Sequence, residues 1–232
     1  MKVAIIPARG GSKRIPRKNI KLFCGQPMLA YPIQTALKSG CFDRIIVSTD
    51  DDEIAEIARQ YGAEVPATRP AELADDHTGT SAVVRYELSQ LLQQGAKISY
   101  CCCIYATTPL LSAVMLQQAW QQLSREPALN YVFSAARFSF PIQRALLQTA
   151  SGVRPFDSSS IGKRSQDLAP TFHDAGQFYW GRTAAWLDNK AIFADHSKML
   201  ILPDHLVQDI DTSEDWHRAE LLFQLLQQEP PR

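Results

Sequence analysis

The first residues of the chain combine glycine with basic side chains in a pattern that suits the binding of a polyanion. An apolar segment, Ile5-Ile6-Pro7, leads directly into a loop that contains the adjacent pair Gly10 and Gly11. Glycine permits positive φ and lets a ligand approach the main chain, and consecutive backbone amides can donate to phosphate oxygens. Positive charge is supplied by the flanking residues Arg9, Lys13, Arg14, Arg17 and Lys18. The segment therefore predicts a phosphate-binding loop.

Other interpretations of this loop can be weighed from its sequence. It lacks the eight-residue P-loop pattern and the G-x-G-x-x-G pattern, so neither a Walker ATPase nor a Rossmann dinucleotide site is supported. A solvated or nucleic-acid-binding basic arm is the remaining alternative. Pro7 and Pro16 fix the backbone at the two ends of the loop, and this favours a held conformation over an arm.

A pair of carboxylates near the other end of the chain could bind a metal ion. Asp209 and Asp211 are separated by one residue. In a strand, residues i and i+2 lie on the same face, so both carboxylates could offer hard oxygen ligands to one magnesium ion. The alternative is a solvated loop that only precedes a helix cap.

Composition indicates one α/β domain in a reducing compartment. A chain of 232 residues can bury a core without disulfides or structural metals. Lys plus Arg and Asp plus Glu both number 24, so the positive charge is local and nucleic-acid binding is not expected. No segment approaches the roughly twenty apolar residues that span a bilayer, and no signal peptide is evident, so we expect a cytoplasmic protein without a membrane partner. The consecutive cysteines 101–103 lie in an apolar run and predict buried thiols, not a zinc site or a nucleophile.

Strand and helix patterns alternate along the chain. Helices are expected over residues 28–38 and 112–125, from the acidic run 50–53 to Gly62, after the polar loop 75–81 to about Gln94, and from about Thr212 to Gln227. Strands are expected over residues 5–7, 44–49, 63–66, 98–105, 131–136, 177–180 and 199–203. This alternation predicts a three-layer α/β/α sandwich with a mainly parallel sheet, whose ligands bind at the carboxyl ends of the strands. The periodicity fades over residues 138–175, which predicts an inserted arm on a single domain, residues 1–232.

The motifs, taken together, resemble those of the CMP-sugar synthetases, cytidylyltransferases that activate sialic-type nonulosonic acids. The resemblance covers essentially the whole chain and rests on Ile6-Pro7-Ala8-Arg9-Gly10-Gly11-Ser12-Lys13, then Pro16, Lys18 and Asn19, then Ser48-Thr49-Asp50, Arg69-Pro70, Thr107-Thr108-Pro109 and Asp209-Ile210-Asp211-Thr212. It implies a Rossmann-like nucleotidyltransferase fold, and attack of a sugar anomeric hydroxyl on the α-phosphate of CTP with release of pyrophosphate. It also implies a homodimer in which the arm takes part in dimerisation.

Two segments of the sequence narrow the choice of sugar substrate. Residues 173–180 and 208–212 are most similar to family members that activate pseudaminic acid for bacterial surface and flagellin glycosylation. Sialic acid synthetases usually have Gln-Pro-Thr-Ser-Pro and Asn-Gly-Ala where this chain has Tyr105-Ala106-Thr107-Thr108-Pro109 and Asp174-Ala175-Gly176. We therefore expect CMP-pseudaminic acid synthesis. The alternatives are a CMP-sialic acid or CMP-ketodeoxyoctonate synthetase and, from a different class, a nucleotide-binding regulatory module without turnover.

The resemblance also assigns roles to residues. Arg9, Lys18 and Asp211 would be catalytic, and Asp209 and Asp211 would hold one or two magnesium ions. The nucleotide would be bound by Ala8, Arg9, Gly10, Gly11, Ser12, Lys18, Asn19, Arg69, Thr80 and Ser81. The sugar would be bound by Tyr105, Thr107, Arg164, Gln166, Asp167, Gln177 and Tyr179. The base that deprotonates the sugar is left open between Asp211 and a metal-bound water.

Overall fold

The centre of the molecule is a six-stranded sheet, seen in a computed structural model that describes residues 1–74 and 78–228. Its strand order is β10-β6-β9-β5-β1-β4. The strands are β1 (Lys2–Pro7), β4 (Arg44–Ser48), β5 (Tyr100–Ile104), β6 (Tyr131–Arg137), β9 (Phe172–Arg182) and β10 (Ser197–Leu202). β1 is parallel to β4 and β5, β10 is parallel to β6, and β9 is antiparallel to both of its neighbours. The expected mainly parallel α/β sheet is confirmed, with β9 as its exception.

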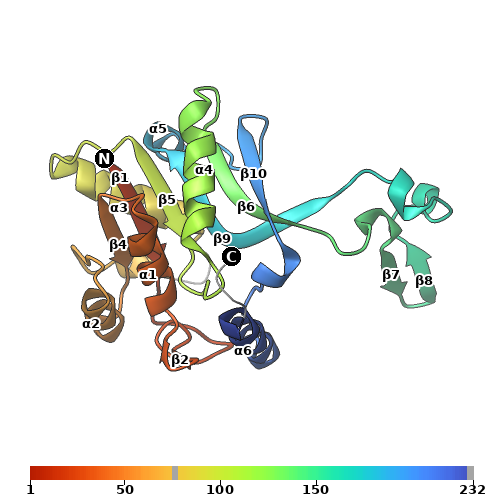
Figure 1. Cartoon of the computed structure of the whole chain (residues 1–232), viewed down its shortest axis with the longest axis horizontal. Helices are drawn as coiled ribbons and strands as arrows, with labels where there is room; N and C mark the ends of the chain where they lie inside the picture. The colour runs from red at the N-terminus through yellow and green to blue at the C-terminus, as the bar shows by residue number, and fades with distance from the viewer. Residues whose placement is uncertain (75–77, 229–232) are drawn as a thin grey trace.

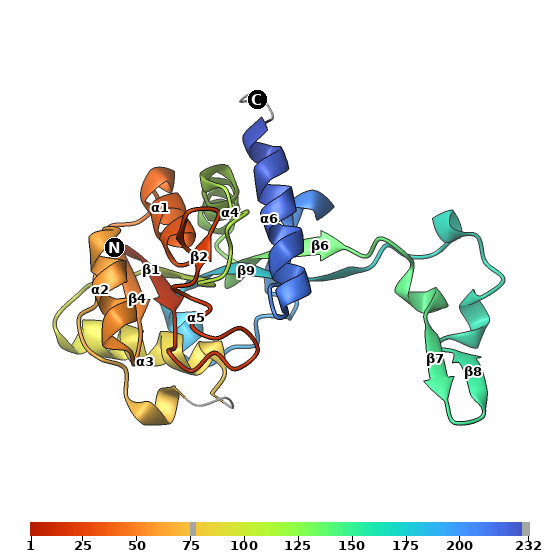
Figure 2. The ribbon, with the colours of Figure 1, turned by 90° about the horizontal axis from the view of Figure 1, so that it is seen from below.

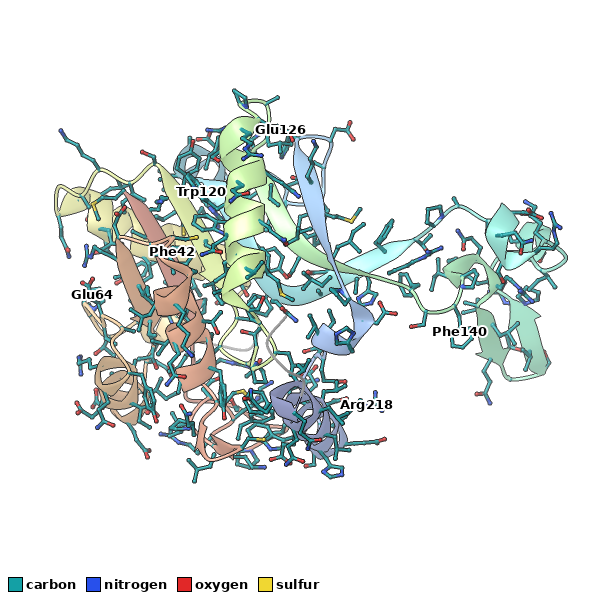
Figure 3. All side chains as sticks on the ribbon, in the orientation of Figure 1. Phe42, Glu64, Trp120, Glu126, Phe140 and Arg218 are labelled. Atoms are coloured by element: carbon teal, nitrogen blue, oxygen red, sulfur yellow. The ribbon has the colours of Figure 1, made fainter. Side chains whose placement is uncertain are left out.

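Helices cover both faces of this sheet, which gives the three layers (Figure 2). One face carries α1 (Ala30–Ser39), α2 (Asp52–Gln60) and α4 (Ala113–Arg125), and the other carries α3 (Thr80–Gln93) and α5 (Thr183–Leu187). Trp180 packs on the first face against Phe42 and Trp120, both visible beside α4 in Figure 3. Trp186 is buried on the second face. These tryptophans therefore belong to the core.

The cysteine run in β5 contributes to both layers. Cys102 packs in the cluster beneath α1 and α4, whereas Cys101 and Cys103 pack in the cluster beneath α3 and α5. All three are free thiols, and burial raises their pKa values. The prediction of buried thiols is confirmed.

A third apolar cluster joins the two ends of the chain. It contains Ile15, Phe23, Met28, Tyr31, Ile210, Trp216 and Ala219. These residues come from the loop after β1, from the short hairpin of β2 (Leu22–Phe23) and β3 (Gln26–Pro27), from the start of α1, and from the region of the last helix, α6 (Ser213–Gln228). The α6 helix begins with a reciprocal cap, in which Asp215 N donates to Thr212 Oγ1 and Thr212 N donates to Asp215 Oδ2. The cluster places the end of the chain beside its first loop.

A long excursion between β6 and β9 stands away from the body in both views (Figures 1 and 2). It carries an antiparallel hairpin of β7 (Leu146–Thr149) and β8 (Gly152–Pro155), with 3-10 turns at Ile142–Arg144, Ser158–Ser160 and Ser165–Asp167. Its large exposed apolar side chains include Phe140, which lies on the excursion in Figure 3. The excursion is called the arm below.

Three local expectations are changed by the structure. The strand expected over residues 63–66 is a single parallel bridge between Ile46 and Glu64, because Pro66 lacks the N–H that would extend the pairing. Residues 209–211 form a loop instead of a strand. The α3 helix has Gly79 as its N-cap, without a side-chain cap bond, and residues 75–77 of the expected capping loop lie outside the described part of the chain.

The remaining short turns are Ala71–Leu73 and Asp204–Leu206. The first helix ends as expected at Gly40. Its φ of 61° is left-handed, and glycine adopts this conformation without the steric cost that a Cβ would add. In the described ranges, every helix is too short or too polar to cross a bilayer.

Candidate active site

A cleft of about 200 Å³ lies at the carboxyl ends of β1 and β5. Its walls come from the loop after β1, the first residue of α3 and the segment after β5. They are formed by Pro7, Arg9, Ser12, Lys13, Arg14, Ile15, Lys18, Asn19, Thr80, Tyr105, Ala106 and Thr107. A second cavity of about 220 Å³ shares Pro7, Arg9 and Thr80 with it and continues to Arg69, Leu73, Thr78 and Val83. The fold thus brings together most of the predicted nucleotide residues.

The glycine pair acts differently from the prediction. Neither Gly10 nor Gly11 has a positive φ, so the expected left-handed turn is wrong, and the loop residue with positive φ is Arg17 at 55°. Gly10 is needed because a Cβ there would lie 2.8 Å from Asp51 Oδ2. Gly10 N donates to Asp50 Oδ1 at 3.0 Å. The glycine therefore allows the loop to pack closely on the acidic run that follows β4.

The acidic run anchors both α2 and the loop. Asp51 caps α2 by accepting from Ile54 N at 3.0 Å, so the expected helix start is confirmed. The same carboxylate accepts two bonds from Arg17, which also pairs with Glu53 at 2.5 Å. The hydrogen bond between Arg17 and Asp51 raises the pKa of Arg17 and lowers the pKa of Asp51. Arg17 thus stabilises the loop from within.

Lys18 connects the loop with the acidic pair at the other end of the chain. Its Nζ donates to Ile210 O at 2.6 Å and lies 3.5 Å from Asp211 Oδ1. Arg14 Nη1 lies 2.7 Å from Asp211 Oδ2. Beneath these polar contacts, Ile15 and Ile210 are both buried in the third apolar cluster. The arrangement brings the basic loop after β1 and the carboxylate pair side by side.

Asn19 fastens the base of the loop. Its buried side chain donates from Nδ2 to Arg9 O at 2.9 Å, and its own carbonyl accepts from Leu29 N. The start of the loop is fixed too, because Ala8 N donates to Ser48 O at 2.9 Å. The loop therefore begins and ends on fixed points of the core.

The two carboxylates fit a magnesium ion. Asp209 and Asp211 flank the buried Ile210, and partial loss of hydration together with the charge of Asp211 raises the pKa of Asp209. A cation would relieve this repulsion. Within the described ranges, no group of three or more Asp, Glu, His or Cys side chains is placed to hold a metal. Two carboxylates suit Mg²⁺, which takes its other ligands from water and substrate phosphates.

Arg69 is a buried cation in the wall of the second cavity. Its side chain is only 3% exposed, its Nη2 lies 3.5 Å from Asp50 Oδ1, and its backbone N donates to Thr49 O at 2.8 Å. Its Nε is buried without a hydrogen-bond partner in the described structure, and burial lowers the pKa of the guanidinium. Because Arg69 lines the second cavity, its guanidinium lies beside any ligand that fills it.

Sequence reasoning missed a second buried charge. Glu87 on α3 is buried and accepts from Ser48 Oγ at 2.6 Å. Burial raises its pKa. Nothing in the sequence separates Glu87 from a surface glutamate, because its partners lie on β4 and beyond.

Two of the predicted sugar residues line the cleft, and a third lies behind it. Tyr105 and Thr107 line the cleft directly, and Thr80 Oγ1 donates to Tyr105 Oη at 3.4 Å. Tyr179 packs 5.4 Å from the Tyr105 ring, and its hydroxyl donates to Asp174 Oδ2 at 2.5 Å. Asp174 thus holds Tyr179 against Tyr105, which lines the cleft.

Other predicted residues lie outside the two cavities of this chain. Arg164, Gln166 and Asp167 are exposed on the arm, where Arg164 Nε pairs with Asp167 Oδ2 at 2.8 Å. Gln177 is buried, and its Nε2 donates to Leu206 O at 2.5 Å. Ser81 follows Thr80 on α3 and is not a wall residue of either cavity.

The fold and the site define a nucleotidyltransferase: a mainly parallel α/β sheet with a basic loop after its first strand, beside a carboxylate pair. A sequence model of the family described as cytidylyltransferase matches residues 3–228, and the chain belongs to this family. The expected family is confirmed.

Individual relatives and solved structures agree with this assignment. A protein of Campylobacter jejuni subsp. jejuni serotype O:23/36 (strain 81-176), named pseudaminic acid cytidylyltransferase, is 45% identical over 224 residues, which cover 96% of each chain. A Helicobacter pylori (strain ATCC 700392 / 26695) protein, named pseudaminic acid cytidylyltransferase and UDP-2,4-diacetamido-2,4,6-trideoxy-beta-L-altropyranose hydrolase, is 37% identical over 90% of this chain and 40% of its own length. The structure of a CMP:2-keto-3-deoxy-manno-octonic acid synthetase complexed with CTP superposes with a TM-score of 0.71 at 17% identity, covering 97% of this chain and 99% of the other.

Proposed function

We propose that this chain transfers CMP from CTP to pseudaminic acid and releases pyrophosphate. The observation that carries the reaction type is the contact of Lys18 with Ile210 O and Asp211, which joins the phosphate-binding loop to the carboxylate pair. Similarity along the whole chain to relatives named for this activity supports the choice of sugar. We place the reaction in the cytoplasm, which the five free thiols suit.

In this proposal the loop binds the triphosphate. Arg9 and Lys18 donate to phosphate oxygens, and the amides around Gly10, Gly11 and Ser12 add neutral donors. The donors are held in place before substrate arrives, so they stabilise the charge that develops on the departing pyrophosphate. Lys18 is already oriented by Ile210 O, and the loop by Asp50 and Asn19.

The second cavity would bind the cytidine. Arg69 lines this cavity, where its guanidinium would donate to an acceptor on the base, and Thr80 lines both cavities, where it would contact the ribose. The sugar acid would then enter from the side of Tyr105 and Thr107. This order along the cleft places the α-phosphate between nucleoside and sugar, as in-line attack requires.

Asp209 and Asp211 would hold magnesium in this scheme. The ion would supply Lewis acidity at the α-phosphate and neutralise phosphate charge. Arg14 and Lys18 hold the Asp211 carboxylate in place, so its oxygens need little reorganisation to serve as ligands. The identity of the group that takes the proton of the sugar hydroxyl stays open between Asp211 and a water.

We further propose that the arm forms a homodimer. It exposes a set of large apolar side chains, each more than 60% exposed: Phe140, Leu146, Val153 and Phe156. Exposed apolar patches mark interaction sites, and a second copy of the chain would bury this one. Arg164, Gln166 and Asp167 would then contact the sugar in the partner's cleft, which explains their distance from Tyr105 here.

The test is a substrate panel. The protein is incubated with CTP, magnesium and pseudaminic acid, sialic acid or ketodeoxyoctonate, and pyrophosphate release is followed. Turnover with pseudaminic acid is expected, and turnover only with sialic acid or ketodeoxyoctonate would reassign the sugar. CTP binding without release of pyrophosphate in the presence of any of the three sugars would support a regulatory module. Sedimentation of the intact protein and of Phe140→Ser/Phe156→Ser tests the dimer, which the double variant should weaken.

A further inference from the structure

The pairing of β9 with β6 is interrupted close to the cleft. Phe133 of β6 pairs with Tyr179, and Ala135, two residues further on, pairs with Asp174. Residues 175–178 of β9 therefore lie opposite a single residue of β6, and they are called the β9 bulge below. Bulges in strands are frequent next to active sites, where they redirect a side chain. This bulge changes the relative position of the two residues that flank it, Asp174 and Tyr179.

Hydrogen bonds hold the β9 bulge in one conformation. Ser134, the residue opposite it, is fully buried, and its Oγ accepts from Gln177 N at 3.2 Å and from Phe178 N at 3.1 Å. Gly176 has a left-handed φ of 60°, which glycine adopts without steric cost, and its N donates to Asp174 Oδ1 at 2.9 Å. The bulge is thus fixed from the core by a serine and from the surface by an aspartate.

The bulge brings Asp174 and Tyr179 into contact. In a regular strand, residues i and i+5 lie about 16 Å apart and point to opposite faces of the sheet. Here the hydroxyl of Tyr179 donates to Asp174 Oδ2 at 2.5 Å. Tyr179 is only 4% exposed, whereas Asp174 is exposed. A hydrogen bond to a carboxylate is stronger than one between neutral groups, so it can fix the orientation of the buried ring.

The same segment packs on Tyr105, which lines the cleft. Tyr105 N donates to Gln177 O at 2.9 Å, and the ring of Tyr105 lies 5.4 Å from the ring of Tyr179. The backbone of the bulge also lies beside this ring, because a Cβ on Gly176 would be 4.0 Å from Tyr105 Cε2. Neither Tyr179 nor Asp174 is a wall residue of the cleft. Their influence on a ligand in the cleft therefore passes through Tyr105.

We propose that Asp174 and Tyr179 are positioning residues for the sugar acid. Their hydrogen bond fixes the ring of Tyr179, and this ring in turn fixes the side chain of Tyr105 against which the sugar lies. The inference rests on the proposed function, because it needs a sugar acid beside Tyr105. It replaces the direct sugar contact expected of Tyr179 by an indirect role. Without the hydrogen bond, Tyr105 turns more freely, and the sugar hydroxyl meets the α-phosphate less often in line.

Steady-state kinetics of Tyr179→Phe test this inference. Phenylalanine keeps the ring that packs on Tyr105 and removes only the hydroxyl. We expect kcat/KM for pseudaminic acid to fall about 10-fold, because the reacting group is held less precisely, while the KM for CTP changes less than about 2-fold. A substitution that only weakened the fold would not separate the two substrates in this way.

Tyr131→Phe is the matched control. Tyr131 is also a buried tyrosine of the central sheet, and its hydroxyl donates to Lys190 O at 3.2 Å. It lies at the amino end of β6, and the cleft lies at the carboxyl ends of β1 and β5. This variant also loses one hydroxyl hydrogen bond, so thermal unfolding compares the two losses of stability. It should keep the wild-type kinetics for both substrates.

Asp174→Asn tests the acceptor of the hydrogen bond. The amide has one acceptor oxygen instead of two, so Gly176 N and the hydroxyl of Tyr179 compete for it. We expect kcat/KM for pseudaminic acid to fall about 3-fold, with an unchanged KM for CTP. In a Tyr179→Phe background the same substitution should have no further effect, since Asp174 acts through that hydroxyl. Because Asp174 is exposed, its single variant also decides the question if Tyr179→Phe does not fold.

The outcomes separate the inference from the proposed function. Wild-type kinetics in a folded Tyr179→Phe, or equal losses for the two substrates, would overturn the inference and leave the proposed function standing. An additive loss in the double variant would do the same. If the wild type releases no pyrophosphate with any of the three sugar acids, the proposed function and the inference both fail.

Discussion

Replacing Gly10 by alanine tests how the phosphate-binding loop is held. The added Cβ would lie 2.8 Å from Asp51 Oδ2, with Asp51 Cβ and Cγ also at 3.1 and 3.3 Å. Contacts below 3.0 Å force one side to move. If Asp51 moves, α2 loses its N-cap bond, worth about 1 kcal/mol, and the bond to Arg17 is strained. If the loop moves, the hydrogen bond between Gly10 N and Asp50 is lost, which costs about 1–3 kcal/mol of stability.

Either route destabilises the protein by about 1–3 kcal/mol, equivalent to a fall in Tm of about 2–12 °C for a chain of this size. Gly11→Ala is the matched control, because its Cβ meets nothing within 4 Å and its φ is not positive. We expect the free energy of unfolding of Gly11→Ala to lie within about 0.5 kcal/mol of the wild-type value or slightly above it. Urea unfolding of both variants measures the difference. Equal stabilities for the two variants would refute the argument from close packing.

Three further perturbations test the charges of the site. Arg9→Ala should lower turnover by about 100-fold or more, measured as pyrophosphate release, because a donor to the phosphates is lost; wild-type rates would refute its role. Asp209→Asn should shift the magnesium titration of activity to higher concentration, and an unchanged titration would move the metal elsewhere. The folded-state pKa of Asp51 is lowered by Arg17, so its contribution to stability is complete above the unfolded pKa and is lost as pH falls through the lower, folded value. The stability of Asp51→Asn should not show this loss as the pH falls. Identical profiles of stability against pH for Asp51→Asn and the wild type would contradict the prediction.

The fold was largely predictable because its strands and helices differ in period. The buried strands β1, β4, β5 and β6 read as continuous apolar runs, and the helices between them show the helical period and end at glycines such as Gly40 and Gly62. The direction of β9 could not be read from its own residues, since an apolar run is the same in either direction. The stretch before it held a signal: a parallel return from β6 needs a crossover, usually a helix, and residues 138–171 offer none.

Candidate site residues could be chosen from the sequence where their type alone suggests a role. Contacts that only the folded chain creates could not be predicted in this way. The basic loop and the carboxylate pair stand out in the sequence because charged and glycine residues are unusual beside apolar runs. The need for Gly10, in contrast, comes from Asp51, and the burial of Glu87 comes from Ser48; both contacts join elements far apart in the chain. Gln177 was assigned to the sugar by resemblance alone, and the fold uses its amide to hold Leu206 O.

The local geometry expected for the carboxylate pair is wrong. Strand alternation was expected to put Asp209 and Asp211 on one face, yet the segment is a loop. Burial of Ile210 in the third apolar cluster replaces the strand, because fixing the middle side chain in the core leaves the carboxylates on either side of it outside. Ile15 from the phosphate-binding loop enters the same cluster, together with Trp216 of α6. The relative position of the basic loop after β1 and the carboxylate pair is therefore set by apolar packing beneath them, and α6 belongs to the support of this candidate site.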